Sequence, residues 1–468
     1  MTDPRERAVV EASADLRREL GLSDLVLTQI LFIVGLAWVG VAAKLGPSHV
    51  VFWLLAMALF YVPSAVVVTW LNGLMPLEGG LYQWAKFGFN EFTGFLVAWN
   101  LGLFAILNVS EIGIQVTQYL GHALPPDASR LMQARWFIVA ASVLVLGALV
   151  WLSIVGLSIG KWVHKAGGAL LLATFAAILL LPVLNRMQDT IQEYRPLATT
   201  LPVISLMSLN LLGKMGFGAY GGFEYVAIHA GETRSPSRTI GRSVLVAAPI
   251  IVLMFILGTS SVVALVPRDG IDLIAPIPQV LAIGFAPFGG ASIVATIGIV
   301  ALVVIRLAQS SVTFGAITRL PMVAGWDGLL PAWFTRLHPK YQTPANAILF
   351  VGGVTLVFAM LGLVGVGKQE AFQVLWNAAG VFYALTYLVM FAIPLVGTRA
   401  LNARPPLWLR LTALSGFLMT LLYVCVSIVP IVQVESRGAF AAKIAAIIVG
   451  ANVAGAMLYR SRRSRQVG

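Results

Sequence analysis

The sequence carries little charge and almost no cysteine. Of its 468 residues only 11% are Asp, Glu, Lys or Arg, and Cys425 is the single cysteine. Soluble domains carry about 25% charged residues, so the composition excludes a water-soluble fold. A single cysteine also excludes a disulfide within the chain and a metal site built from several cysteines.

Signatures of common enzyme classes are missing too. The chain has no H-E-x-x-H segment and no G-x-x-x-x-G-K-[ST] loop, and its five histidines are scattered. These motifs hold metal ligands or phosphate-binding backbone at a spacing that catalysis requires. The segments between apolar runs are also too short for a separate soluble domain. We therefore expect no enzymatic activity, no sensor or adhesion function and no cofactor.

Hydrophobic residues, by contrast, make up 59% of the chain. About 20 apolar residues are needed for one helix to cross a bilayer. Runs of that length occur near 24–44, 50–74, 92–120, 136–157, 163–184, 204–229, 243–266, 290–317, 345–366, 372–396, 411–432 and 439–459. The sequence therefore predicts an all-α membrane protein with about 12 transmembrane helices.

The net charge of +12 indicates an orientation. Lys and Arg in short loops resist translocation, and with a cytoplasmic N-terminus they favour the cytoplasmic side by roughly two to one. We expect a multi-pass protein of the plasma (inner) membrane with both termini cytoplasmic. Its basic excess would face anionic lipid, without a nucleic-acid partner. The polar start of the chain lacks the apolar core of a removable signal peptide.

The first and sixth apolar runs, here called span 1 and span 6, are interrupted by small residues. Span 1 contains Gly35, Ala37 and Gly40, and span 6 contains five glycines between residues 213 and 222. Each glycine costs about 1 kcal/mol relative to alanine in a helix. Interruptions at corresponding places in two halves indicate an inverted repeat with a binding site at the bilayer midplane.

This repeat predicts the organisation of the chain. The chain would consist of a cytoplasmic segment (1–23), a ten-helix transport core (24–396) with halves 24–184 and 204–396, two additional helices (397–459) and a basic cytoplasmic tail (460–468).

Broken helices expose backbone groups that protein, water or ligand must satisfy. The N–H groups near Gly221 and Gly222 would attract a carboxylate, and the opposite carbonyls would suit an ammonium group. This combination favours a zwitterion such as an amino acid. The alternative is that the small residues only allow close helix packing.

Three segments resemble the amino acid permeases of the APC (amino acid, polyamine, organocation) superfamily. They are PLEGGLYQW (76–84), GFEYVAIHAGETRSPSRTIGRSV (222–244) and TRLPMVAGWDGLLPAWFTRLHPKYQTP (318–344). The resemblance implies a LeuT-like fold, in which a five-plus-five inverted repeat with broken helices 1 and 6 precedes two C-terminal helices. It also implies secondary active transport by alternating access.

By the same resemblance, the substrate would lie between spans 1 and 6. The implied contacts are Val34, Gly35, Leu36, Ala37, Phe217, Ala219, Tyr220 and Gly221. The chain departs from the family in span 1, where Trp38 and Val39 precede Gly40 and many members have more glycine.

Ionisable residues within spans are further candidates because they are costly in hydrocarbon. Glu111 shares a helix face with Asn108 and Gln115, while Lys214 lies in span 6 and Arg306 in span 8. These charges could form an ion pair that only holds the helices together. Otherwise Glu111 could bind a cationic group, Arg306 or Lys214 could bind an anionic one, or the cluster could carry a coupling proton.

Other polar residues are candidates for coupling or gating. Glu224 could fix the half-helix or sense a proton, and Glu232 could form a gating or loop-fixing ion pair at the cytoplasmic end. Asn377 could line the pathway. Ser310 and Ser311 could bind sodium together with carbonyls of span 1, or could simply bond to their own helix. Coupling to a proton, coupling to sodium and exchange all remain open.

The sequence thus predicts a secondary active transporter of amino acids. A polyamine or organic cation carrier is the alternative if Glu111 is unpaired, and an integral membrane enzyme is a remote third. The expected partners are a small-molecule substrate and the lipid bilayer, with no obligatory protein partner.

Overall fold

The computed structural model describes residues 4–14, 16–123, 130–132, 134–191, 194–271, 276–289, 291–361, 368–396, 405–429 and 436–467. Throughout these ranges the regular elements are helices, apart from an isolated β-bridge between Leu20 and Thr233. Nine of the described helices are long and apolar enough to cross a membrane, and one bent pair would make a tenth. The expectation of an all-helical membrane fold is confirmed.

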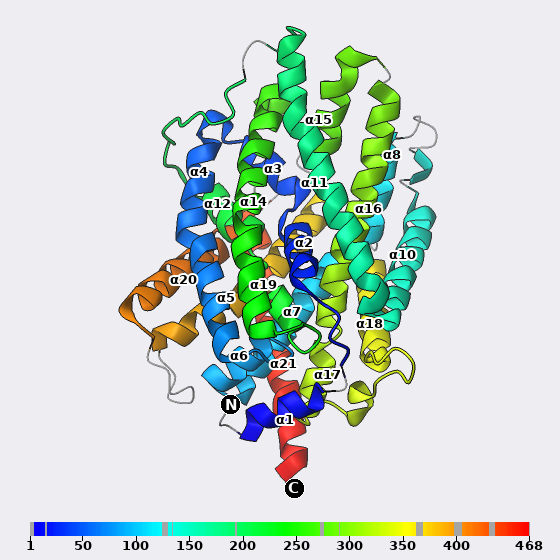
Figure 1. Ribbon diagram of the computed structural model, residues 1–468, viewed down its shortest axis with the longest axis vertical. Helices are drawn as coiled ribbons and strands as arrows, with labels where there is room; N and C mark the ends of the chain where they lie inside the picture. Colours follow the sequence, from blue (N-terminus) through cyan, green and yellow to red (C-terminus); the bar gives the residue numbers. More distant parts are fainter. Residues whose placement is uncertain are drawn as a thin grey trace.

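In the N-terminal part of the chain the long helices run roughly along the long axis of the bundle, whereas the first short helix lies across the end that holds the termini (Figure 1). The helices of this part follow in chain order. They are α1 (Pro4–Ala12), α2 (Leu22–Ile33), α3 (Leu36–Ala43), η1 (Gly46–Ser48), α4 (His49–Ala56), η2 (Met57–Tyr61), α5 (Val62–Leu74), α6 (Leu81–Gly88), α7 (Glu91–Ser110), α8 (Ile112–Ala123), α10 (Arg135–Val155) and α11 (Leu157–Met187).

The remainder continues the bundle after a long connection. Its helices are α12 (Leu206–Gly213), η3 (Lys214–Ala219), α13 (Tyr225–Ile228), α14 (Pro236–Leu265), η4 (Arg268–Gly270), α15 (Pro276–Phe285), η5 (Ala286–Phe288), α16 (Ala291–Ile317), α17 (Leu320–Trp326), η6 (Ala332–Thr335), α18 (Ala345–Leu361), α19 (Lys368–Val396), α20 (Leu407–Ser427) and α21 (Arg437–Val467). Helix α21 runs on into the predicted basic tail, and both chain ends lie at the same end of the bundle (Figure 1).

Span 1 is broken where its small residues predict a break. Helices α2 and α3 meet at an angle of 44°. The residues between them are Val34 and Gly35, and Gly35 has extended backbone angles. The chain therefore changes direction within the interior of the bundle.

Span 6 is interrupted over a longer stretch. Helix α12 widens into the π-helical turn η3, and the chain then leaves helical geometry until the single turn α13. Gly222 has a φ of +138° and lies against the Phe32 ring, so no other residue would fit there without strain. The glycine-rich sequence is thus used for an open segment.

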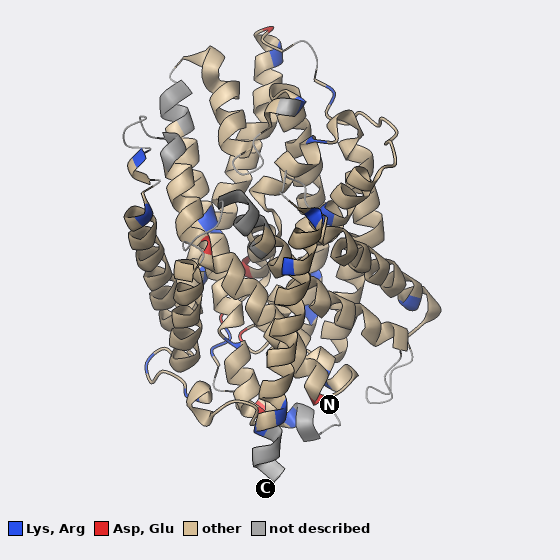
Figure 2. Cartoon of the chain, turned by 180° about the vertical axis from the view of Figure 1, so that it is seen from behind, with Lys and Arg blue, Asp and Glu red and all other residues tan. Residues whose placement is uncertain are grey.

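Charge is distributed unevenly over the bundle. Figure 2 shows long stretches of helix without charged residues, and a group of charged positions near the end that holds both termini. Large apolar side chains such as Leu144, Trp162 and Leu245 are exposed on the flanks of the bundle. An apolar flank of this kind is suited to contact with lipid.

Candidate functional site

A cavity of about 120 Å³ lies beside the break in span 1. Helices α7, α16 and α19, the turn η3 and the break itself contribute its walls. Five predicted site residues line it, namely Gly35, Asn108, Phe217, Gly221 and Arg306. The structure therefore brings together candidates from spans 1, 3, 6 and 8.

The break in span 1 leaves backbone groups of both signs. The carbonyl oxygens of Leu31 and Val34 accept hydrogen bonds from Gln309 Nε2, at 2.8 and 3.0 Å. Helix α3 has no side-chain cap at its N-terminus. Among the described residues, nothing accepts a hydrogen bond from the N–H groups of Leu36 and Ala37. These two donors follow Gly35, which lines the cavity.

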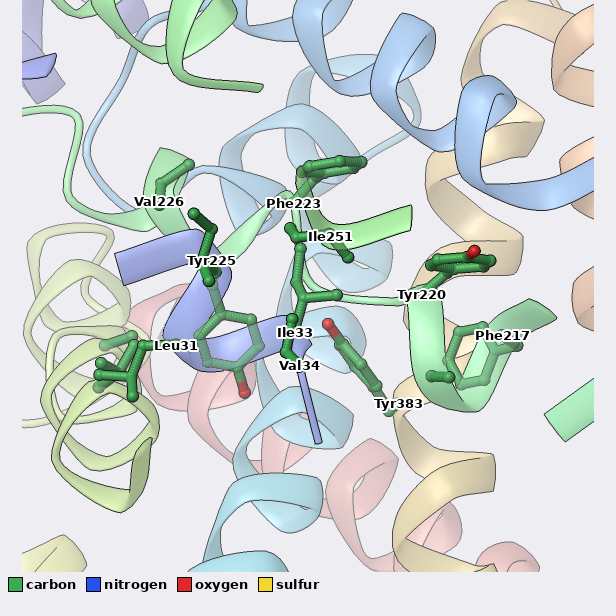
Figure 3. Packing of buried hydrophobic residues seen from close by; sticks show 14 of the residues in the cluster. Leu31, Ile33, Val34, Phe217, Tyr220, Phe223, Tyr225, Val226, Ile251 and Tyr383 are labelled. Atoms are coloured by element: carbon green, nitrogen blue, oxygen red, sulfur yellow. The ribbon is translucent and has the colours of Figure 1, made fainter. Parts of the chain in front are cut away.

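Aromatic rings enclose the break. Figure 3 shows Ile33 and Val34 between the Tyr225 ring on one side and the rings of Tyr383 and Phe217 on the other. The Phe217 and Tyr383 centroids are 5.3 Å apart. Rings at this separation attract one another and exclude water from the space between them.

Trp38, the departure from the family pattern, also lines the cavity. Its ring covers Gly218, where a Cβ atom would approach the indole to 2.6 Å. A bulky residue in span 1 is therefore matched by a glycine in span 6. The pairing explains how the glycine-poorer break is accommodated.

Arg306 reaches the cavity from α16. Its Nε donates to Gln115 Oε1, and its Nη2 donates to Asn108 Oδ1 at 3.4 Å. Glu111 lies in the turn between α7 and α8, and its backbone carbonyl accepts a hydrogen bond from the Gln115 N–H at 3.0 Å. Gln115 and Asn108 thus hold the guanidinium, whereas the buried Glu111 carboxylate does not line the cavity.

Glu224 lies behind the cavity wall. The hydroxyls of Tyr383 and Tyr387 each donate to one of its carboxylate oxygens. The Tyr387 oxygen also accepts from the Gly222 N–H, at 2.7 Å. Tyr383 lines the cavity, so its side chain connects the cavity wall to Glu224.

A second buried polar group lies at the end of the bundle that holds both termini. Arg319 binds both oxygens of Glu232, with Nη2 to Oε1 at 3.0 Å and Nε to Oε2 at 3.2 Å. His229 Nδ1 lies 2.7 Å from Glu232 Oε2, and the Gly231 N–H donates to Glu78 Oε2 at 2.7 Å. We call these four side chains, Glu78, His229, Glu232 and Arg319, the terminal cluster.

All three segments that resemble the permeases meet at the terminal cluster, since Arg319 belongs to 318–344, His229 and Glu232 to 222–244, and Glu78 to 76–84. Gly80 packs against the Ala227 backbone, where an added Cβ would lie only 2.8 Å from the carbonyl carbon. The GG pair thus lets the segment at 76–84 approach the α13 turn closely. Neighbouring Glu78 is placed beside Glu232 as a result.

The two carboxyls of the cluster titrate in opposite directions. Burial, together with the charge of Glu232, raises the pKa of Glu78 well above its usual range. Burial alone would raise the pKa of Glu232 too, but Arg319 and His229 outweigh it and lower that pKa to about 2. Three ligand atoms of Glu78, His229 and Glu232 lie within 4.8 Å of one another, a spacing that could hold a metal ion. Arg319 already binds Glu232, so the arrangement suits an ion pair better.

The remaining predicted residues lie outside the cavity wall. Val34, Leu36, Ala37 and Ala219 are neighbours of lining residues, and the Tyr220 ring packs against Trp53 and Phe255. Asn377 donates to the Ser427 carbonyl on α20 at 3.0 Å. Lys214 is buried in η3 and has no polar partner in the described part of the chain.

The serines proposed for sodium face different surroundings. Ser311 Oγ lies 3.2 Å from His164 Nε2. Ser310 Oγ is buried, with no hydrogen-bond partner among the described residues.

A pentapeptide with the G-x-S-x-G pattern at 156–160 marks the start of α11, where the Ser158 hydroxyl donates a hydrogen bond to the Val155 carbonyl. No strand precedes it in the described chain, so it is not a hydrolase nucleophile turn.

Several cavity residues were not among the predicted contacts. They are mainly large side chains and include Phe32, Trp38, Phe104, Gln309, Trp376 and Tyr423. Gln309 follows Arg306 by three residues and so shares its helix face, a spacing visible in the sequence. The aromatic residues carry no such signal because most aromatic residues in membrane helices serve packing.

Comparison with known proteins agrees with this architecture. Residues 20–451 match the amino acid permease family. The chain is 24% identical to an uncharacterized transporter of Legionella pneumophila over 80% of each chain. It is also 24% identical to the branched-chain amino acid permease BcaP of Bacillus subtilis, over 78% of this chain and 81% of that one.

A plant transporter is also similar to this chain. Cationic amino acid transporter 7 of Arabidopsis thaliana is 26% identical over 80% of this chain and 67% of its own length. The relatives are transporters and permeases, and none of those cited is an enzyme. The chain belongs to the amino acid permease family of the APC superfamily, as an integral multi-pass membrane transporter.

Proposed function

We propose that this protein is a secondary active transporter that moves amino acids across the plasma (inner) membrane by alternating access. The observation that carries the proposal is the cavity at the break of span 1, beside two unbonded N–H groups at the start of α3. The fold we propose has about 12 spans, arranged as the five-plus-five repeat with two further helices. The domain limits expected from the sequence belong to this proposal.

The two ends of an amino acid fit the two kinds of backbone group at the break. Its carboxylate accepts hydrogen bonds from the N–H groups of Leu36 and Ala37, where the helix dipole is positive. Its ammonium group donates to carbonyl oxygens of the cavity wall, such as those of Ile33 and Phe217, which have a second lone pair. The aromatic rings then exclude water from the bound molecule.

Two groups of side chains, the Tyr383–Phe217 pair and the terminal cluster, lie between the cavity and the ends of the bundle. Tyr383 and Phe217 close one wall, and Tyr383 links the bound molecule to Glu224. The terminal cluster ties together the α6 segment, the α13 turn and the end of span 8. We propose that it forms the cytoplasmic gate, with both termini cytoplasmic, and that opening separates Glu232 from Arg319.

The position of Gln309 argues against sodium as the coupling ion. Its amide group occupies the span 1 carbonyls to which a sodium ion held by Ser310 and Ser311 would bind. This favours a sodium-independent cycle, in which Glu224 carries a proton or the protein exchanges two amino acids. The sodium site stays a prediction that uptake with and without sodium can test.

A ligand screen followed by one pair of variants tests the proposal. An amino acid that binds the purified protein raises its thermal midpoint by mass action. In Gly221→Leu the side chain would collide with the Phe217 carbonyl, 2.8 Å from the first added carbon, so we expect binding and uptake to be lost. Gly353 is exposed, with open space around it, so Gly353→Leu should bind normally. Normal uptake by Gly221→Leu would contradict the proposal.

A further inference from the structure

The cavity has a charged wall that an ordinary zwitterion leaves unused. Of the described residues that line it, Arg306 alone carries a charge. We propose that the transported amino acid carries a second acidic group, as aspartate and glutamate do, and that Arg306 binds this group. The inference rests on the proposed amino acid transport and narrows its substrate class.

The contacts of Arg306 leave part of its guanidinium available. Both its partners, Gln115 and Asn108, offer neutral amide oxygens. Its Nη1 has no hydrogen-bond partner among the described residues, and the side chain is only half-buried. The amides hold the plane of the guanidinium without neutralising it. Such an orientation suits a carboxylate that arrives from the cavity, because guanidinium binds carboxylate through two parallel hydrogen bonds.

No carboxylate of the described chain is ion-paired with the Arg306 guanidinium. Glu111 is buried outside the cavity wall, and no ion pair within 4 Å joins it to Arg306 in the described chain. The Arg306 Nε donates to the Gln115 amide oxygen instead. Both oxygens of Glu224 accept hydrogen bonds from tyrosines. A polyamine or lysine side chain would therefore meet a like charge in the cavity.

Distance along α16 limits the length of the substrate. Arg306 lies one helical turn from Gln309, which binds the carbonyls of the span 1 break. Three residues correspond to about 4.5 Å along a helix axis. An amino acid whose α groups lie at the break would therefore need one or two side-chain carbons to reach the guanidinium. The cavity of about 120 Å³ is also small for a ligand site.

Binding to the purified full-length protein and uptake into proteoliposomes test the inference. The ligands are L-glutamate, L-aspartate, L-glutamine, L-leucine and glutarate, which lacks the amino group. We expect the two acidic amino acids to bind best and Arg306→Gln to weaken glutamate by about 10- to 100-fold, the loss of one charge-assisted contact. Arg306→Lys keeps the positive charge and should lose less affinity for glutamate than Arg306→Gln does. Arg186→Gln, which removes an exposed arginine at the end of α11, should leave binding unchanged.

The outcomes separate this inference from the proposed function. Tight binding of a neutral amino acid that Arg306→Gln leaves unchanged would overturn the role of Arg306 and keep amino acid transport. Failure of every amino acid to bind would overturn the proposed function and, with it, the inference. Glutarate binding as tight as that of glutamate would contradict amino acid transport but support carboxylate binding at Arg306. Better glutamine than glutamate binding by Arg306→Gln, with normal yield and monodispersity, would support the inference.

Discussion

Arg306 and Arg319 lie on the same apolar helical span, Thr296–Trp326, yet have opposite surroundings. Arg319 is 2% exposed, and both oxygens of Glu232 bind it. Arg306 is half-buried, bonds to two neutral amides and lines a cavity. Arg319 is ion-paired with a carboxylate of the protein, whereas Arg306 has no ion pair within 4 Å in the described chain and faces a cavity that a carboxylate can enter. An arginine in a membrane span is therefore interpreted from its partner as much as from its position.

The largest effect that the comparison predicts is on stability. Arg319→Gln leaves Glu232 buried without its partner, so we expect a loss of about 3–5 kcal/mol of unfolding free energy. Arg306→Gln removes hydrogen bonds to two neutral amides and breaks no ion pair within 4 Å in the described chain, so it should cost about 1 kcal/mol. Thermal unfolding in detergent measures both variants.

A double variant sharpens this test. Arg319→Gln combined with Glu232→Gln removes both charges, so it should recover part of the stability lost by Arg319→Gln alone. Equal losses in Arg306→Gln and Arg319→Gln would show that both arginines serve the structure, and the distinction between them would fail.

An intermediate effect is expected at Gln309, which belongs to the cavity side of the comparison. Gln309→Met leaves the carbonyls of Leu31 and Val34 without their donor, at a cost of about 1–3 kcal/mol. If these carbonyls can accept a cation, NaCl should raise the thermal midpoint of the variant more than KCl does. The unchanged protein should respond equally to both salts. A specific sodium response of the unchanged protein would contradict a sodium-independent cycle.

The smallest effect concerns pH and the terminal cluster. The raised pKa of Glu78 means that the folded protein keeps a proton which the unfolded chain releases, so this group reduces stability as pH rises above its ordinary value of 4.5. The lowered pKa of Glu232 has the opposite sign, and its contribution is lost as pH falls from 4.5 toward 2.

Glu78→Gln therefore removes the pH dependence that comes from Glu78 and keeps the one that comes from Glu232. We expect the stability of the variant to rise relative to that of the unchanged protein between pH 5 and pH 8, because glutamine cannot lose a proton and still accepts from the Gly231 N–H. Midpoints measured across that range check the sign. If the stability of the variant instead falls relative to that of the unchanged protein as pH rises, Glu78 is ionised in the folded protein.

The sequence identified the elements better than their contacts. Small residues mark both helix breaks because glycine is costly in a continuous helix, and helical spacing placed Asn108 and Gln115 on one face. The partner of Glu232 was not predictable in this way. Arg234, Arg238 and Arg242 are close in sequence, but the residue that binds Glu232 is Arg319, 87 positions away. Long-range pairs of this kind follow from the packing of helices, which no local pattern encodes.

The segment that precedes α2 and contains Glu19 and Leu20, here called the N-terminal arm, is hydrogen-bonded to the turn that contains Glu232. The backbone N–H groups of Glu19 and Leu20 both donate to the Glu232 carbonyl, and the Arg234 N–H donates to Leu20. Any movement of this turn must therefore peel away the arm or carry it along. A bulky fusion placed ahead of the arm would load a moving part, whereas in the described chain α21 packs on α7 and α19 and forms no hydrogen bond with that turn. Purification tags and fluorescent reporters consequently belong on the C-terminal end of this protein.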